Sequence, residues 1–509
     1  MSQFTGMEQY VIGVDIGTGS AKAVAINNAG KPIAVSQIFY KTNSPQPGFS
    51  EQDPEVICKA FLECISKVIS QLNQVPGAVS ISCAMHSLII IDEKNNPLTA
   101  LITWEDTRSE KIAEQLRNSS EAENIYTVTG TPIHAMTPLC KIKWFRENAP
   151  ATFKSANKFI SIKEFIWFRL FGVYEIDYSI ASATGLFDSK NFSWNKPSLE
   201  FCGISPAQLS EIVSTDFCRK NISSSLAKTL GISTDINFCI GASDGCLANI
   251  GSDAIDAGIA AVTIGTSGAV RIASGSAVVN YEAMIFNYVL DKQTFISGGP
   301  VNNGGNVLKW LFKTFWNNDK ATDKDYEDLF KEIESVEAGC KGLLFLPYIH
   351  GERAPVWDGE ASGIFFGIRA YHRRAHFSRA ALEGICFTLK NILEIIESSS
   401  AEIKQLNVSG GFVQSKIWMQ ILADISGKKL CLVQTEDASS IGAAIFYMKS
   451  AHLIKDYRSL KEEVVVTINP DENNQIIYDK CYKVFKNLYQ PMKESMHELL
   501  KLNSQQNFK

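Results

Sequence analysis

A short segment near the N-terminus constrains the fold more than any other. Residues 13–22 read GVDIGTGSAK. Apolar residues 11–14 predict a buried strand, and residues 22–26 predict a second strand running back beside it. Glycines let the turn approach a phosphate closely, its N–H groups can donate to phosphate oxygens, and a carboxylate there can hold Mg²⁺ through water. The segment predicts a phosphate-binding hairpin, although an ordinary hairpin carries the same pattern; its polar groups come from Asp15, Gly17, Thr18, Gly19 and Ser20.

The same scheme returns in the second half of the chain. Residues 261–271 read AVTIGTSGAVR, again a strand, a Gly-Thr-Ser-Gly turn and a strand, but without the aspartate. Two such hairpins predict a duplicated domain with a nucleotide between the copies. A three-stranded meander, a helix and further strands follow the ribonuclease-H-like order. We therefore expect an α/β protein with two such domains flanking a central cleft, the second meander formed by residues 262–264, 269–273, 286–290 and 295–298.

Length and composition narrow the possible partners. A chain of 509 residues suggests about two to four domains. Its net charge of −5 provides no basic field for a nucleic acid, and no apolar run approaches the ~20 residues that span a bilayer. Residues 1–10 lack the basic and apolar parts of a signal peptide. Twelve scattered cysteines without metal-binding spacing are typical of a reducing compartment. We expect a cytoplasmic protein that binds neither nucleic acid nor membrane.

Several helices are predicted from capping residues and apolar spacing. One begins at Pro54, where the missing N–H of proline is harmless. Apolar residues at helical spacing predict a long buried helix over residues 375–397. Ser415 is expected to cap a helix over residues 416–426, and a terminal helix is expected over residues 479–502.

Asp244 is the strongest catalytic candidate. It follows a predicted strand and lies between Ser243 and Gly245, whose small side chains leave room for a substrate. Ligands of α/β sheets lie beyond the carboxyl ends of strands. A kinase that acts on a hydroxyl needs a carboxylate to receive its proton. The same position suits a helix N-cap, so the residues alone leave both roles open.

Four further pairs carry weaker signals: Gly304-Gly305, Gly410-Gly411, Met85-His86, and Asp106 with Arg108. A glycine pair can admit adenine or a phosphate, or form a simple turn. A single histidine is more often structural than catalytic. The acid and the arginine could hold a ligand or pair with one another. Residues alone therefore favour a two-domain phosphotransferase without naming its substrate.

Two long motifs give the chain a resemblance to a known family. Residues 136–148, MTPLCKIKWFREN, and residues 363–383, with G-x-F-x-G-I and H-F-x-x-A-A-L-E, resemble the two signatures of the FGGY carbohydrate kinases. The resemblance covers about residues 11–448. It implies two ribonuclease-H-like domains of the actin and hexokinase ATPase type. Residues 1–250 would form the sugar-binding side, and residues 251–509 the ATP-binding side.

Within the family, six stretches are most similar to the gluconate kinases: residues 84–87, 102–109, 130–134, 177–183, 241–245 and 298–305. The implied reaction is ATP + D-gluconate → ADP + 6-phospho-D-gluconate, in a cleft whose closure excludes water. Xylulose kinases share the Met-His pair, so a pentulose or polyol kinase is the nearest rival. A non-enzymatic actin-like nucleotide switch is the rival from another class. Each of these functions is compatible with a homodimer.

The resemblance also implies roles for individual residues. Asp244 would take the proton from the terminal hydroxyl and, with Asp15, would hold Mg²⁺. Arg108 would be the nearest cation for a gluconate carboxylate, with His134 as a second candidate. The sugar would contact Met85, His86, Asp106 and Arg108. ATP would lie against Gly17, Thr18, Ser20, Gly265, Thr266, Gly305, Lys309, Gly410, Gly411 and Ser415, although related kinases often carry asparagine in place of Ser415.

Overall fold

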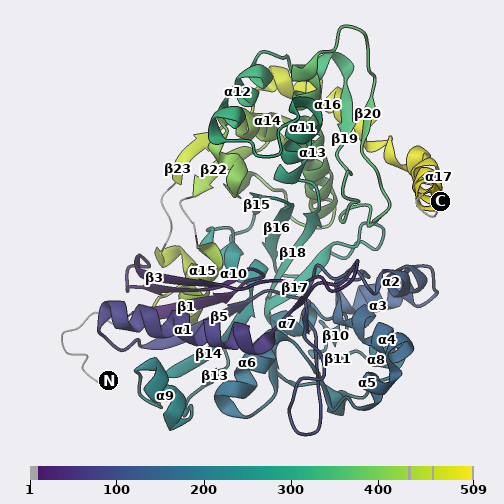
Figure 1. Cartoon of the computed structure of the whole chain (residues 1–509). Coiled ribbons are helices and arrows are strands. Elements are labelled where there is room, and N and C mark those ends of the chain that lie inside the picture. The colour runs from purple at the N-terminus through teal and green to yellow at the C-terminus, as the bar shows by residue number, and fades with distance from the viewer. Residues whose placement is uncertain (1–9, 434–436, 461–463, 507–509) are drawn as a thin grey trace.

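The computed structural model describes residues 10–433, 437–460 and 464–506. Residues 1–9, where no signal peptide is predicted, lie outside this description. The chain forms two α/β domains, each built on a mixed sheet, and the sheet of the first half lies below that of the second half in Figure 1. The predicted two-domain α/β architecture is therefore confirmed.

The first sheet has the strand order β13-β14-β5-β1-β2-β3. Its centre is the predicted meander, in which β2 pairs antiparallel with both β1 and β3, while β5 runs parallel to β1. Helix α1 (Pro54–Leu72) packs on β2 and β3 and begins at the predicted proline. The strands are β1 (Val11–Ile16), β2 (Ser20–Ile26), β3 (Pro32–Phe39), β5 (Ala78–Cys83), β13 (Cys218–Arg219) and β14 (Asn237–Ser243).

The second sheet has the order β17-β18-β16-β15-β21-β22-β23. The expectation of a meander in chain order is wrong here, because β18 rather than β17 pairs with β16. The displaced β17 lies at the sheet edge, where its backbone N–H groups meet the first half: Asn287 N donates to Gly130 O and Val289 N to Ser182 Oγ. The strands are β15 (Ile259–Ile264), β16 (Gly268–Ser274), β17 (Phe286–Asp291), β18 (Thr294–Val301), β21 (Gln405–Ser409), β22 (Lys429–Val433) and β23 (Val464–Ile468).

Helices cover the second sheet largely as predicted. Helix α13 (Arg374–Glu397) is the long buried helix, and α14 (Lys416–Ser426) begins after its cap, Ser415. The single terminal helix is a wrong expectation. The chain forms α16 (Glu472–Lys486) and α17 (Tyr489–Gln506), which projects from the upper domain in Figure 1. Tight i to i−3 hydrogen bonds end α16 and turn the chain between the two helices.

The remaining elements connect these layers. They are β4 (Glu51–Gln52), β6 (Ile89–Ile91), β7 (Leu101–Ile102), α2 (Glu110–Arg117), α3 (Ala122–Thr129), α4 (Pro138–Asn148), α5 (Pro150–Lys154), β8 (Lys158–Ile160), α6 (Ile162–Phe171), β9 (Glu175–Asp177), α7 (Tyr178–Ser182), β10 (Phe187–Asp188), β11 (Ser193–Trp194), α8 (Lys196–Cys202), β12 (Glu211–Val213), α9 (Ser224–Leu230), α10 (Asp244–Gly251), α11 (Gly305–Trp316), α12 (Asp323–Glu334), β19 (Leu344–Leu346), β20 (Ile364–Phe366) and α15 (Ala438–Ser450). In the described part of the chain, no helix combines the length and apolarity that crossing a membrane requires.

Helix α15 links the two halves most closely. It comes from the second half of the chain, yet it packs on β1 and on α10 of the first half. Glycines permit this approach: a Cβ on Gly13 would lie 1.8 Å from Ser440 O, and one on Gly442 would lie 1.9 Å from Leu247 O. The domain boundary near residue 250 therefore stays a prediction, since packing does not follow chain order at this point.

Candidate active site

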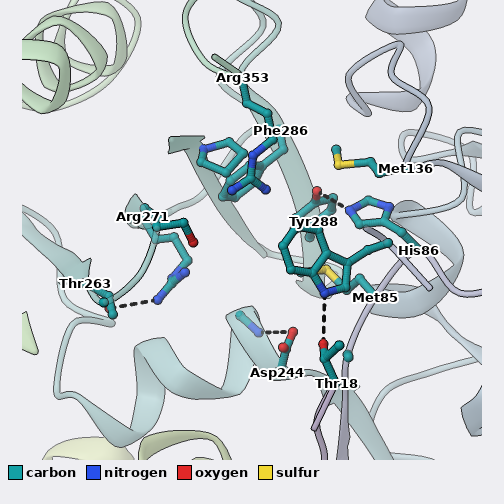
Figure 2. A pocket seen from close by; sticks show the side chains of 18 of the residues that line it. Thr18, Met85, His86, Met136, Asp244, Thr263, Arg271, Phe286, Tyr288 and Arg353 are labelled. Carbon is teal, nitrogen blue, oxygen red and sulfur yellow. Dashed lines mark hydrogen bonds between the residues drawn. The ribbon is translucent and has the colours of Figure 1, made fainter. Parts of the chain in front are cut away.

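A cavity of about 380 Å³ lies between the two sheets. Figure 2 shows Asp244 and Thr18 on one side of the view and Arg353 on the opposite side. Both halves of the chain line it: Thr18, Met85, His86, Trp104, Met136 and Asp244 from the first half, and Thr263, Gly265, Thr266, Arg271, Phe286, Tyr288 and Arg353 from the second. The cavity is therefore the central hollow that the duplicated hairpins predict.

A second cavity, of about 680 Å³, adjoins the first. Gly265 and Thr266 line both, so a group bound at this turn reaches the two hollows at once. Aromatic side chains of the second cavity offer flat apolar surfaces to a planar base. Its other residues include Gly305, Leu308, Lys309, Tyr326, Phe330, Gly411, Phe412, Gln414 and Trp418.

Glycines bring three backbone segments together around the shared turn. Gly410 has φ of +96°, and a Cβ there would lie 2.4 Å from Ile264 O. Gly305 N donates to Gly265 O at 2.7 Å, which ties the start of α11 to the turn. The glycine pairs singled out in the sequence thus let the loops approach one another. Of these residues, Gly265, Gly305 and Gly411 line the second cavity, whereas Gly410 does not.

Asp15 and Asp244 are two half-buried carboxylates whose charges act on one another, and Asp244 lines the first cavity. Burial first, and then the charge of Asp244, raise the pKa of Asp15 to about 7. Ser82 Oγ donates to Asp15 Oδ1 at 2.6 Å, across the parallel pairing of β1 and β5. Burial likewise raises the pKa of Asp244, while the N–H of Gly245 and the charge of Arg271 oppose that rise. Each charge therefore needs a nearby cation.

The two carboxylates fit the needs of Mg²⁺. Magnesium keeps several waters and takes one or two protein carboxylates together with substrate phosphates. Within the described ranges, no group of three or more His, Cys, Asp or Glu side chains could hold a metal by itself. The charges of Asp15 and Asp244 repel one another, and Asp244 lines the same cavity as the shared phosphate turn. The pair therefore suits a cation that brings its other ligands with it.

The helix-cap alternative for Asp244 does not hold, since Ser243 is the N-cap of α10. Its Oγ accepts from Cys246 N at 3.4 Å. Asp244 is the first residue of the helix, and its Oδ1 accepts from Gly245 N at 2.7 Å. The carboxylate thus lies at a helix N-terminus and lines the cavity, which leaves its second oxygen for a ligand.

His86 lines the cavity as a neutral, fully bonded side chain. Its Nδ1 lies 2.7 Å from Ala183 O, and its Nε2 lies 3.0 Å from the hydroxyl of Tyr288. The carbonyl can only accept, so Nδ1 carries the proton and Tyr288 donates to Nε2. Burial, and then the charge of Lys141, lower the pKa of His86 to about 3. The histidine therefore positions Tyr288 and does not act as an acid.

The lowered pKa of His86 predicts that the folded protein becomes less stable as the pH falls. Between the folded pKa of about 3 and the ordinary value of 6.5, the unfolded chain binds more protons, so stability falls as the pH drops. From about pH 7.5 to about pH 5, the wild type should lose roughly 2 kcal/mol more unfolding free energy than His86→Asn. Asparagine tolerates the φ of +64° at this position. Urea denaturation at both pH values measures the difference, and equal losses in the two proteins would contradict it.

The predicted sugar contacts of Asp106 and Arg108 require correction. The guanidinium of Arg108 donates to both carboxylate oxygens of Asp106, each at 2.8 Å, and also to Glu51. Both residues are buried, and neither is among the residues that line the cavity. The alternative that the two residues pair with one another is the one the structure supports. His134, the second cation candidate, is also absent from the lining; its Nδ1 accepts from Met136 N.

Four residues predicted to contact ATP line neither of the two cavities: Gly17, Ser20, Gly410 and Ser415. The hydroxyl of Ser415 accepts from Trp418 N at 3.3 Å as the expected cap of α14, and its adenine contact stays a prediction. The hydroxyl of Ser20 accepts from Gln37 Nε2 at 2.8 Å. Thr18 does line the first cavity, and its Oγ1 accepts from Trp104 Nε1 at 2.9 Å.

Among the lining residues that were not selected from the sequence, four carry polar groups with a bearing on the chemistry: Trp104, Arg271, Tyr288 and Arg353. Trp104 lies inside the stretch 102–109 that carries the resemblance, whereas Arg353 lies in residues 350–355, HGERAP, which have no role assigned from the sequence. Arg271 ends the second hairpin motif. Tyr288 follows no motif, and its place depends on the displaced edge strand β17.

Comparisons with known proteins show which family the chain is similar to. Residues 10–251 match the N-terminal domain model, and residues 260–451 the C-terminal domain model, of the FGGY family of carbohydrate kinases. A gluconokinase of Bacillus licheniformis is 38% identical over 95% of this chain and 96% of its own length. Two structures from Lactobacillus acidophilus, a gluconate kinase and a ligand-bound xylulose kinase, each superpose with a TM-score of 0.92 at 31% identity. They cover 97% and 96% of this chain, respectively, and 100% of their own.

Proposed function

The chain belongs to the FGGY family of carbohydrate kinases, and we propose that it transfers the γ-phosphoryl group of ATP to the 6-hydroxyl of D-gluconate. The observation that carries this proposal is the position of Asp244 in a cavity that shares its phosphate turn with a second, nucleotide-sized hollow. The gluconokinase similarity of 38% favours gluconate, although the two solved structures are equally similar to the chain.

The residues of the two cavities have separate roles in this reaction. The 6-hydroxyl oxygen of gluconate attacks the γ-phosphorus while Asp244 accepts the hydroxyl proton, and ADP leaves on the opposite side of the phosphorus. Arg271 keeps Asp244 ionised, because its guanidinium charge opposes the burial of that carboxylate. Gly265 and Thr266 hold the phosphates between the two cavities, while Lys309, Gly411 and Phe412 bound the nucleoside. Mg²⁺ held by Asp15 and Asp244 would neutralise phosphate charge.

The cavity also bears on the rival functions. A nucleotide switch needs the second cavity to bind its nucleotide. It does not need the carboxylate of Asp244 and the guanidinium groups of Arg271 and Arg353 in a separate cavity. A pentulose kinase would also need the carboxylate base. Its substrate is neutral, so it would not need a cation to bind a substrate carboxylate. Xylulose is therefore the rival to be tested directly.

An acceptor panel tests the proposal. Purified protein with ATP and Mg²⁺ is assayed for ADP release on gluconate, xylulose, ribulose and glycerol. We expect kcat/KM for gluconate to exceed that for each neutral acceptor by about 100-fold or more, because a buried charge pair is lost with every one of them. A preference for xylulose would replace the proposed substrate, and ADP release that no acceptor stimulates would favour the switch.

A further inference from the structure

Arg353 presents a partly unused guanidinium to the cavity. The residue is buried, with 9% of its surface exposed. Its Nε donates to Asn302 Oδ1 at 2.7 Å, and one terminal nitrogen donates to Val301 O at 3.1 Å. A guanidinium has five N–H groups in a planar fork. Figure 2 shows the side chain reaching into the cavity, so the remaining donors are available to a ligand there.

The charge of Arg353 has no ion-pair partner among the described residues. The adjacent Glu352 is occupied: its carboxylate accepts from Asn302 N, Asn303 Nδ2 and Arg353 N. Glu105 is the other acid whose charge acts on Arg353, and its residue is exposed at the surface. The charge of Glu352 compensates the guanidinium only in part, because burial still lowers the pKa of Arg353. Since a buried cation that is incompletely paired is costly, the site favours an anionic ligand.

The two cavity arginines belong to different ends of the hollow. Arg271 is the one whose charge interacts with Asp244, and it donates to Thr263 Oγ1 at 3.2 Å beside the phosphate turn. Figure 2 shows Arg353 on the side of the cavity opposite Asp244, so Arg353 marks the end of the cavity away from the reacting hydroxyl.

Contacts on two sides hold this guanidinium in place. Asn302 fixes Nε, and the carbon of the guanidinium lies 5.2 Å from the ring centroid of Trp104. The indole of Trp104 is itself fixed, since Nε1 donates to Thr18 Oγ1 in the first phosphate turn. The distance from the cation to the phosphate turn is thereby set by rigid side chains.

We propose that Arg353 binds the carboxylate of the acceptor and thereby selects a sugar acid, with its far hydroxyl at Asp244. This inference rests on the proposed function and replaces the sequence-based assignment of that role to Arg108. A planar guanidinium binds a carboxylate through two parallel hydrogen bonds, whereas a neutral sugar would leave the cation unpaired. Arg353 thus acts on substrate choice and takes no part in the proton transfer.

The test compares gluconate with D-glucitol, which carries CH₂OH where gluconate has its carboxylate. For Arg353→Gln we expect kcat/KM on gluconate to fall by about 30-fold or more, mainly through KM, and kcat/KM on glucitol to change by less than about 3-fold. Arg353→Lys should recover part of the loss, because it restores the charge without the planar fork. Calorimetric titration of gluconate should show the same order of affinities.

Arg108→Gln is the matched control, since it removes another buried arginine outside the cavity. It should lower stability but leave the ratio of gluconate to glucitol activity within about 2-fold of wild type. Equal losses on both acceptors in Arg353→Gln, or a collapse of the ratio in Arg108→Gln, would overturn the assignment. A wild type that does not use gluconate would instead refute the proposed function.

Discussion

Replacing Asp244 by asparagine should lower kcat for sugar phosphorylation by about 10³-fold or more, with ATP affinity changed by less than about 3-fold. A positioned general base contributes about 10²–10⁴-fold, and asparagine cannot accept the proton. The amide is nearly isosteric and can still accept from Gly245 N, so the start of α10 should remain intact. Asp244 does not line the second cavity, where we propose that the nucleoside of ATP binds. Single-turnover assays measure the first effect, and nucleotide titration the second.

Ser243→Ala provides the control for this variant. It removes the cap of α10, which costs about 1 kcal/mol of stability, but leaves the carboxylate next to it. Its turnover should therefore stay within about 10-fold of wild type at a temperature where both proteins are folded. Near-normal turnover in Asp244→Asn, or an equally deep loss in Ser243→Ala, would show that the carboxylate is not the base.

Local patterns explain what the sequence could predict. The hairpins and the start of α1 at Pro54 depend on residues within a few positions of one another. Ser415 shows the limit of such reasoning: its capping role is local and was predicted correctly, while the adenine contact depended on where the loop points. The fold of each half could be predicted because its patterns are also local in sequence. The exception is β17, which lies at the sheet edge and contacts the other half of the chain.

The cation of the cavity could not be read from local sequence. Arg108 lies beside Asp106 in a stretch shared with the family, which made it the nearest candidate for a substrate carboxylate. In the structure, the guanidinium of Arg108 donates to both carboxylate oxygens of Asp106, so these donors are not available to a substrate. Arg353 comes from a distant loop; its backbone partner Val301 ends β18, and its side-chain partner Asn302 follows that strand. Only tertiary contacts decide which arginine keeps donors free.

Replacing Gly13 by alanine should be strongly destabilising. The new Cβ would lie 1.8 Å from Ser440 O in α15, so the carbonyl would have to retreat by more than about 1 Å to reach an ordinary contact. Both partners are backbone, one in a central strand and one in a helix, and neither can rotate away. We expect a loss of at least about 3 kcal/mol of unfolding free energy, measured by urea denaturation.

The same shift should reach the site, because α15 is fastened to the first phosphate hairpin. Ser440 Oγ donates to Lys22 O, and Asp437 before the helix pairs with the ammonium of Lys22. A displaced α15 therefore moves the strand that follows Thr18, and kcat should fall together with stability. Gly359→Ala is the matched control, since nothing lies within 4 Å of its Cβ position, and it should change stability by less than about 0.5 kcal/mol. If Gly13→Ala were as stable and active as Gly359→Ala, the close packing of α15 on β1 could not be what sets the position of the hairpin.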